Sequence, residues 1–234
     1  MFYYGYGLDS GYLLVIIAAI LSLVASAKVN STFKKYSQKH TARNITAERA
    51  ARSILDSNGL HDVKIEPISG NLTDHYDPRA NVIRLSESVI NSTSVAAVGV
   101  AAHEAGHAVQ YATNYGPIRL RASIVSLTQF SSRWAIYILM FGILLSFGFL
   151  AKIGFWLYAV VAFFQLVTLP VEFNASRRAL TALEDGGALD REELSGARKV
   201  LSAAAMTYVA ALLSALVQLL RLWSIVQSNE RRRR

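Results

Sequence analysis

Four long uncharged, apolar runs divide the chain, at residues 11–27, 134–151, 153–169 and 200–220. The remaining stretches have the mixture of charged and apolar positions that is typical of soluble protein. Each run is about long enough to cross a bilayer as a helix. The pattern therefore predicts a multi-pass membrane protein with about four transmembrane helices, rather than one very apolar soluble domain.

Features at the ends of these runs refine the prediction. No positive charge precedes the run at 11–27, whereas a signal peptide begins with a positive region, so we expect a retained transmembrane helix. The second and third runs predict an antiparallel helical hairpin with a tight turn at Lys152, which a polar link at 114–133 precedes. Asp190 and Glu193 resemble a capping box that begins the last helix.

Two segments predict helices outside the membrane. Residues 46–58 place their apolar residues on one helical face and are followed by Gly59, which is typical of a helix end. From Ser94 an apolar helix extends to residue 112. Its uncharged part is too short to cross a bilayer, so we expect a buried core helix.

Short alternating segments between these helices predict a small β-sheet. Residues 62–68 alternate between apolar and polar positions, and residues 71–84 predict a strand, a turn at 77–81 and a further strand. The fold class is therefore mainly α, of the α+β type, with about four transmembrane helices and a sheet of about three strands.

Composition and charge exclude several kinds of chemistry. The chain has no cysteine, so any metal must be held by His, Asp or Glu. The net charge is +8, but the basic residues cluster beside the apolar runs, which favours contact with the lipid bilayer and no nucleic-acid partner. More of them lie on the side that holds residues 28–132 and 170–199, which predicts that this side is cytoplasmic.

The predicted core helix contains the sequence HEAGH at residues 103–107, an HExxH motif. Four residues advance a helix by about 400°, so His103 and His107 leave one face and can bind one tetrahedral zinc ion. Glu104 is the next residue after His103 and lies beside the histidines on the helix surface. There it can take a proton from a zinc-bound water that attacks a peptide carbonyl. The other interpretation, three polar side chains buried without a ligand, is energetically costly.

Two histidines leave such a zinc ion one protein ligand short. Glu172 is the candidate, because it follows Pro170 at the exit of an apolar run in a sequence that is short of charge. Ser176 lies one helical turn further on the same face, where it could orient a histidine. The alternative to a metal ligand is that Glu172 lies at the membrane interface and forms an ion pair with Arg177 or Arg178.

Three segments together resemble the YugP-type neutral zinc metallopeptidases, a family of small prokaryotic membrane proteins. The segments are HEAGHAVQ at 103–110, DHYDPRANVIRLS at 74–86 and PVEFNASRRAL at 170–180. The resemblance covers nearly the whole chain and implies one Zn²⁺ per chain, with His103, His107 and Glu172 as ligands and Glu104 as the catalytic residue. The chain resembles more distantly the gluzincin-like membrane proteases of the HtpX type, which implies a small zincin-like catalytic domain.

Further residues are candidates for positioning the metal ligands or contacting substrate, namely His75, Asn174, Ser176 and Arg177. His75 precedes the turn at 77–81 and either binds a developing oxyanion or fixes the turn, with the second role favoured. Residues 82–85 are predicted as an edge strand that pairs with an extended substrate backbone.

The function predicted from the sequence is a zinc-dependent endopeptidase at the surface of the cell membrane. It would act on peptides or membrane proteins, in membrane-protein quality control, and could assemble as a homo-oligomer or with a membrane scaffold partner. The alternatives are a non-catalytic zinc-binding scaffold and a site-2-type intramembrane protease. The predicted parts are a transmembrane helix (11–27), a soluble metallopeptidase part (28–133), a transmembrane hairpin (134–169), a third-ligand helix and loop (170–199) and a C-terminal transmembrane helix (200–226).

Overall fold

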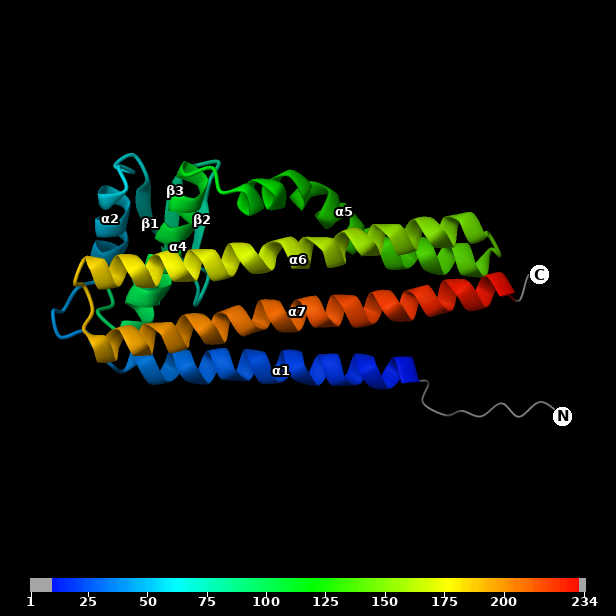
Figure 1. The fold of residues 1–234 in the computed structure, drawn as a ribbon, viewed down its shortest axis with the longest axis horizontal. Coiled ribbons are helices and arrows are strands. Elements are labelled where there is room, and N and C mark those ends of the chain that lie inside the picture. The colour runs from blue at the N-terminus through cyan, green and yellow to red at the C-terminus, as the bar shows by residue number, and fades with distance from the viewer. Residues whose placement is uncertain (1–9, 232–234) are drawn as a thin grey trace. The chain divides into compact units, whose positions relative to one another are not determined.

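The computed structural model describes residues 10–231 (Figure 1). Contacts divide the chain into two compact units, the first made of residues up to 24, 120–168 and from 208, and the second of 25–119 and 169–207. The elements in chain order are α1 (Ser10–Ser37), α2 (Ala47–Ser57), β1 (Lys64–Ile68), β2 (His75–Asp77), β3 (Val82–Ser86), α3 (Glu87–Ile90), α4 (Val95–Ala112), α5 (Gly116–Leu144), α6 (Gly148–Asp185) and α7 (Arg191–Arg231). The predicted class, mainly helical with a three-stranded sheet, is confirmed.

Three helices are long and apolar enough to cross a membrane, judged by length and composition. They are α1, α6 and α7, each with an 18-residue stretch of high mean hydropathy and few charges. α4 is not among the candidates in the described part of the chain, in agreement with its predicted place as a core helix. Nor is α5, so residues 10–231 contain three such helices, which is roughly consistent with the predicted number of about four.

α5 begins earlier than the sequence predicts. The stretch 114–133 was expected to be a polar link, but the helix starts at Gly116 and continues without a break to Leu144. Pro117 lies in its first turn, where the missing backbone N–H leaves no hydrogen bond unmade. Most of this polar stretch is therefore helical, and its polar side chains do not indicate a loop.

The turn between α5 and α6 lies before the predicted position. Lys152 is inside α6, and the chain reverses at residues 145–147 instead. Ser146 adopts a left-handed conformation with φ 54°, and the N–H of Phe147 donates to the carbonyl of Gly142 at 2.8 Å. Lys152 is therefore part of a helix although it interrupts the apolar run. The residues of the turn itself carry no charge.

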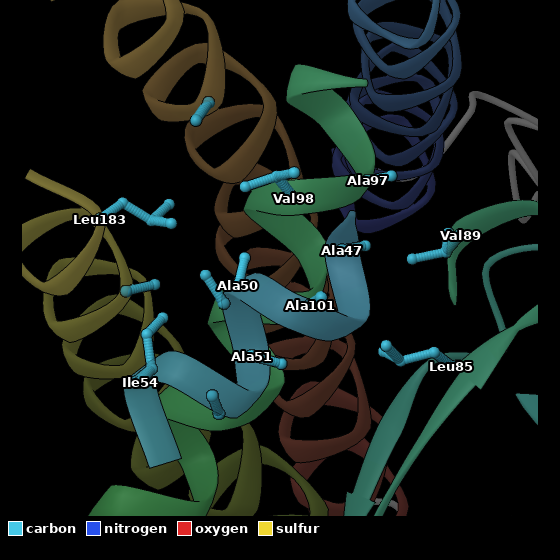
Figure 2. Close-up of a cluster of buried hydrophobic side chains, with 14 of the residues drawn as sticks. Ala47, Ala50, Ala51, Ile54, Leu85, Val89, Ala97, Val98, Ala101 and Leu183 are labelled. Carbon is cyan, nitrogen blue, oxygen red and sulfur yellow. The ribbon is translucent and has the colours of Figure 1, made fainter. Parts of the chain in front are cut away.

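The core of the second unit forms where α2 packs on α4 (Figure 2). The apolar face predicted for α2 is confirmed, because all of its members are buried: Ala47, Ala50, Ala51, Ile54 and Leu55. Leu183 of α6, Leu85 of β3 and Val89 of α3 join the same cluster. Each large apolar side chain buried in this way stabilises the fold by about 1.5–3 kcal/mol.

The sheet has the order β1-β3-β2, with β3 parallel to β1 and antiparallel to β2. The predicted hairpin of β2 and β3 is confirmed, and its turn is held by Asp77, whose carboxylate accepts from the N–H groups of Arg79 and Ala80. A hydrogen bond from Arg84 at 2.9 Å is the main reason that the pKa of Asp77 lies below its ordinary value. The expectation that residues 82–85 form an edge strand is wrong, because β3 is the middle strand and both of its edges are paired.

Candidate metal centre

α4 carries both histidines of the HExxH motif on one face. The helix is capped by Ser94, whose hydroxyl accepts from the N–H of Ala97 at 3.2 Å, and its small apolar residues are buried in the core of the second unit. The two imidazole rings lie 4.7 Å apart at an angle of 81°. The helical spacing therefore places His103 and His107 side by side, as predicted.

Glu172 meets these histidines from α6. One of its carboxylate oxygens, Oε2, lies 3.3 Å from Nε2 of His103 and 3.6 Å from Nε2 of His107. α6 continues through Pro170 and does not end there, so the carboxylate is held within a continuous helix. The three side chains each offer one donor atom within 4.8 Å of the others, and Glu172 is only 2% exposed.

The outward-facing nitrogens of both rings are engaged by neighbouring side chains. Nδ1 of His103 lies 3.1 Å from the hydroxyl of Ser176, and Nδ1 of His107 lies 3.0 Å from Oε1 of Gln110. An amide oxygen only accepts, so Nδ1 of His107 carries a proton, and Nε2 is the ring nitrogen on the side of Glu172. Partners of this kind orient metal-binding histidines and raise their basicity.

Gln110 is the residue that sequence reasoning missed. It is fully buried, and its Nε2 donates to the carbonyl of Val171 at 2.8 Å and to Oδ1 of Asn174 at 2.9 Å, which fixes the amide orientation. Asn174 also accepts from Nε of Arg178, so a chain of hydrogen bonds reaches from Arg178 to His107. The available signal was spacing, since Gln110 lies three residues after His107 on the same helical face.

Glu104 is held by the edge strand of the sheet. The backbone N–H of Tyr76 in β2 donates to its Oε2 at 2.9 Å, and the residue is 8% exposed. The ring of Tyr76 packs at 5.6 Å from that of Tyr111, one turn beyond the motif. The HExxH carboxylate is therefore fixed by a strand, while the histidines are fixed by α4 and α6.

The charge of this site favours a cation. Burial lowers the pKa of His107, but the hydrogen bond with Glu172 and the negative charge of Glu104 outweigh burial, and the pKa is raised overall. Two imidazoles and the Glu172 carboxylate thus converge within reach of the negative charge of Glu104, and the site favours positive charge.

Two other sequence candidates lie outside the three-residue cluster. Nδ1 of His75 pairs with the carbonyl of Thr73 at 2.8 Å, which agrees with a role in holding the local chain. Arg177 is exposed and lines a cavity of about 540 Å³ between α2, α4 and α6. Of the positioning candidates, Ser176 contacts a cluster histidine directly and Asn174 contacts one through Gln110.

Gly106, inside the motif, allows α4 and α6 to approach closely. A Cβ atom added there would lie 2.6 Å from the carbonyl oxygen of Ala175, a distance that forces the backbones apart. Gly99, on the same helix, has room, because its added Cβ would meet Ala197 at 3.4 Å.

We therefore expect Gly106→Ala to destabilise the protein by about 1–3 kcal/mol through overpacking, and to loosen the metal site. The measurement is thermal unfolding together with zinc content. Gly99→Ala is the matched control, and helix propensity alone should make it neutral or slightly stabilising. Equal effects of the two variants would contradict the close-approach argument.

The donor set fits a zinc ion. Two imidazole nitrogens and one carboxylate oxygen are the ligands found in catalytic zinc sites of the HExxH type, which keep the fourth position open. The hydrogen-bond partners of both Nδ1 atoms and the position of the Glu104 carboxylate suit the same class of site. The donor set and its surroundings are those expected of a metallopeptidase-type centre.

Comparison with known proteins assigns the family. The family model described as "Putative neutral zinc metallopeptidase" matches residues 11–227, and the chain belongs to this family. It is 47% identical over 211 residues to the "Putative membrane protease YugP" of Bacillus subtilis (strain 168), covering 90% of this chain and 94% of that protein. No solved structure matches the chain.

Proposed function

We propose that this chain is a zinc-dependent endopeptidase that works at the membrane surface. His103, His107 and Glu172 would hold one zinc ion, and Glu104 would act as the general base. The observation that carries the proposal is the convergence of three donor atoms from α4 and α6 within 4.8 Å. Membership of the zinc metallopeptidase family supports the same reading.

Each residue has a separate task in this proposal. Zinc, when bound, supplies Lewis acidity that polarises a peptide carbonyl and lowers the pKa of a water molecule. Glu104 accepts a proton from the attacking water and passes it to the leaving amine nitrogen. The N–H of Tyr76 holds the Glu104 carboxylate at Oε2, which leaves Oε1 for the water.

The alternatives fit the structure less well. A zinc-binding scaffold would close the fourth position with a further protein ligand and would not need a carboxylate held beside the metal. A site-2-type intramembrane protease would place the motif within a membrane span. α4 is packed in the core of the second unit and is not one of the three candidate spans among residues 10–231.

The proposed setting is the cell membrane, with α1, α6 and α7 crossing it, the end of α5 crossing as the other arm of the hairpin at 134–169, and the second unit on the cytoplasmic side. The support is the apolar length of these helices and the excess of basic residues beside them. Peptides or membrane proteins are the proposed substrates, in membrane-protein quality control. The printed description of the Bacillus relative as a membrane protease is consistent with this setting.

The test is metal removal and return. Full-length protein in neutral detergent should cleave an unfolded protein such as casein, should lose this activity on treatment with a chelator, and should regain it with about one zinc ion per chain. Magnesium added in place of zinc is the control, because it prefers oxygen ligands. Cleavage that survives complete zinc removal would overturn the proposal.

A further inference from the structure

A groove with a strongly positive rim lies between α1 and α7 in the second unit. The two helices run side by side there in opposite directions (Figure 1), with Lys39 paired to Glu192 and Tyr36 packed against Gly196. The groove has a volume of about 480 Å³. Besides Tyr36, its polar lining consists of four cations and two aliphatic hydroxyl groups, from Lys28, Thr32, Lys35, Arg198, Lys199 and Ser202.

No carboxylate lines this groove among the described residues, so its positive charge is not neutralised from within. The acidic residues at the start of α7 are engaged elsewhere. Glu192 pairs with Lys39 at 3.0 Å, and Glu193 accepts from the backbone N–H groups of Ala42 and Asp190. The four cations are exposed side chains along one groove, and an anion bound among them would lower their mutual repulsion.

Contact between the two helices closes the base of the groove. Tyr36 is 7% exposed, and an added Cβ at Gly196 would lie 2.8 Å from its ring, so the two helices are in close contact beneath the charged rim. Ala203, which is buried, and Met206, which is 51% exposed, add apolar lining on the α7 side. The groove therefore offers a charged rim and an apolar base to the same ligand.

The position of the groove along both helices is also informative. Lys28 directly follows the apolar run at 11–27, and Met206 lies inside the apolar run at 200–220. If these runs cross the bilayer, the groove lies where the hydrocarbon region ends and the lipid headgroups begin. Basic clefts between membrane helices at this depth bind phosphate-bearing lipid headgroups.

We propose that this groove is a binding site for the phosphate headgroup of an anionic phospholipid. The lysines and Arg198 bind the phosphate oxygens, the hydroxyls of Thr32 and Ser202 add hydrogen bonds, and the acyl chains follow the apolar surface of α1 and α7. The site depends on the proposed membrane crossing of these helices and not on peptidase activity. A free phosphate ion has the same charge chemistry but would gain nothing from the apolar base.

The test measures binding of short-chain lipids to the full-length protein in neutral detergent. The probes are dioctanoyl phosphatidylglycerol, dioctanoyl phosphatidylcholine and inorganic phosphate. We expect the wild type to bind the phosphatidylglycerol more tightly than the other two probes, and less tightly as salt is raised. The double variant Lys35→Gln/Arg198→Gln should weaken this binding about tenfold or more, since each basic residue near a lipid headgroup contributes roughly one factor of five.

The matched control is Lys34→Gln/Arg191→Gln, which removes the same charge from exposed positions of the same helices that do not line the groove. It should bind lipid like the wild type. Equal losses of lipid binding in both double variants would show that overall charge, and not the groove, causes the binding, and would overturn the proposal. Binding of inorganic phosphate as tight as that of phosphatidylglycerol, or equal binding of phosphatidylcholine, would also overturn it. Zinc content and thermal unfolding of the variants should match the wild type, which separates this site from the metal centre.

Discussion

Replacement of Glu172 by alanine should lower zinc affinity by more than about 100-fold, beyond the roughly 10- to 100-fold that loss of an outer hydrogen-bond partner costs. The reason is that one carboxylate oxygen lies 3.3 Å and 3.6 Å from the two histidine nitrogens and completes the donor set. The measurement is zinc per chain in detergent-purified protein, with about one ion expected in the wild type.

Two companion variants keep this result interpretable. Glu184→Ala removes an exposed carboxylate from the same helix and should retain zinc. Glu172→Gln keeps the shape of a side chain that is 2% exposed, so a loss of zinc in this variant is not a consequence of a cavity in α6. Full zinc retention in both Glu172 variants would show that the third ligand lies elsewhere.

Replacement of Glu104 by glutamine should leave zinc content unchanged and reduce peptide hydrolysis by about 10²- to 10⁴-fold, the usual contribution of a positioned general base. The amide keeps the size of the carboxylate and can still accept the N–H of Tyr76, but it cannot take a proton from water. The measurement is the rate of substrate cleavage at matched zinc occupancy.

The control for this variant is Glu87→Gln, which changes an exposed carboxylate in the same unit and should be fully active. A zinc-binding scaffold would be indifferent to the Glu104 change, and so would a peptidase with another base. Undiminished cleavage in the variant would therefore remove Glu104 from the proposed chemistry while leaving the metal site intact.

Local signals in the sequence were enough to predict much of the fold. The apolar face of α2 is confirmed, as are the hairpin turned by Asp77 and the reciprocal capping bonds between Asp190 and Glu193. These features depend on residues within a few positions of one another. They therefore appear in periodicity and in short motifs.

Features that depend on distant contacts were predicted less well. β3 reads as an edge strand from its own residues, because nothing in residues 82–86 indicates that both β1 and β2 pair with it. Lys152 looks like a turn residue within an apolar run, yet α6 continues through it, and the turn is made by Ser146 without glycine or proline. Pairing and helix ends of this kind are decided by tertiary structure.

The metal centre shows the same division. Helical spacing places His103 and His107 together, while Glu172 could be chosen from the sequence only by its unusual position after an apolar run. Gln110 was missed because its importance depends on Val171 and Asn174, which reach it only when α4 and α6 pack together.

The three donor atoms come from two helices whose contributing residues stand about 70 positions apart in a chain without cysteine. An ion held by both helices would tie these distant segments together in the folded protein, although, unlike a disulfide, it would be released when the chain unfolds. Because the donors converge only after folding, the affinity for the ion becomes part of the free energy of folding. The concentration of available metal would then affect the stability of the folded protein as well as its activity.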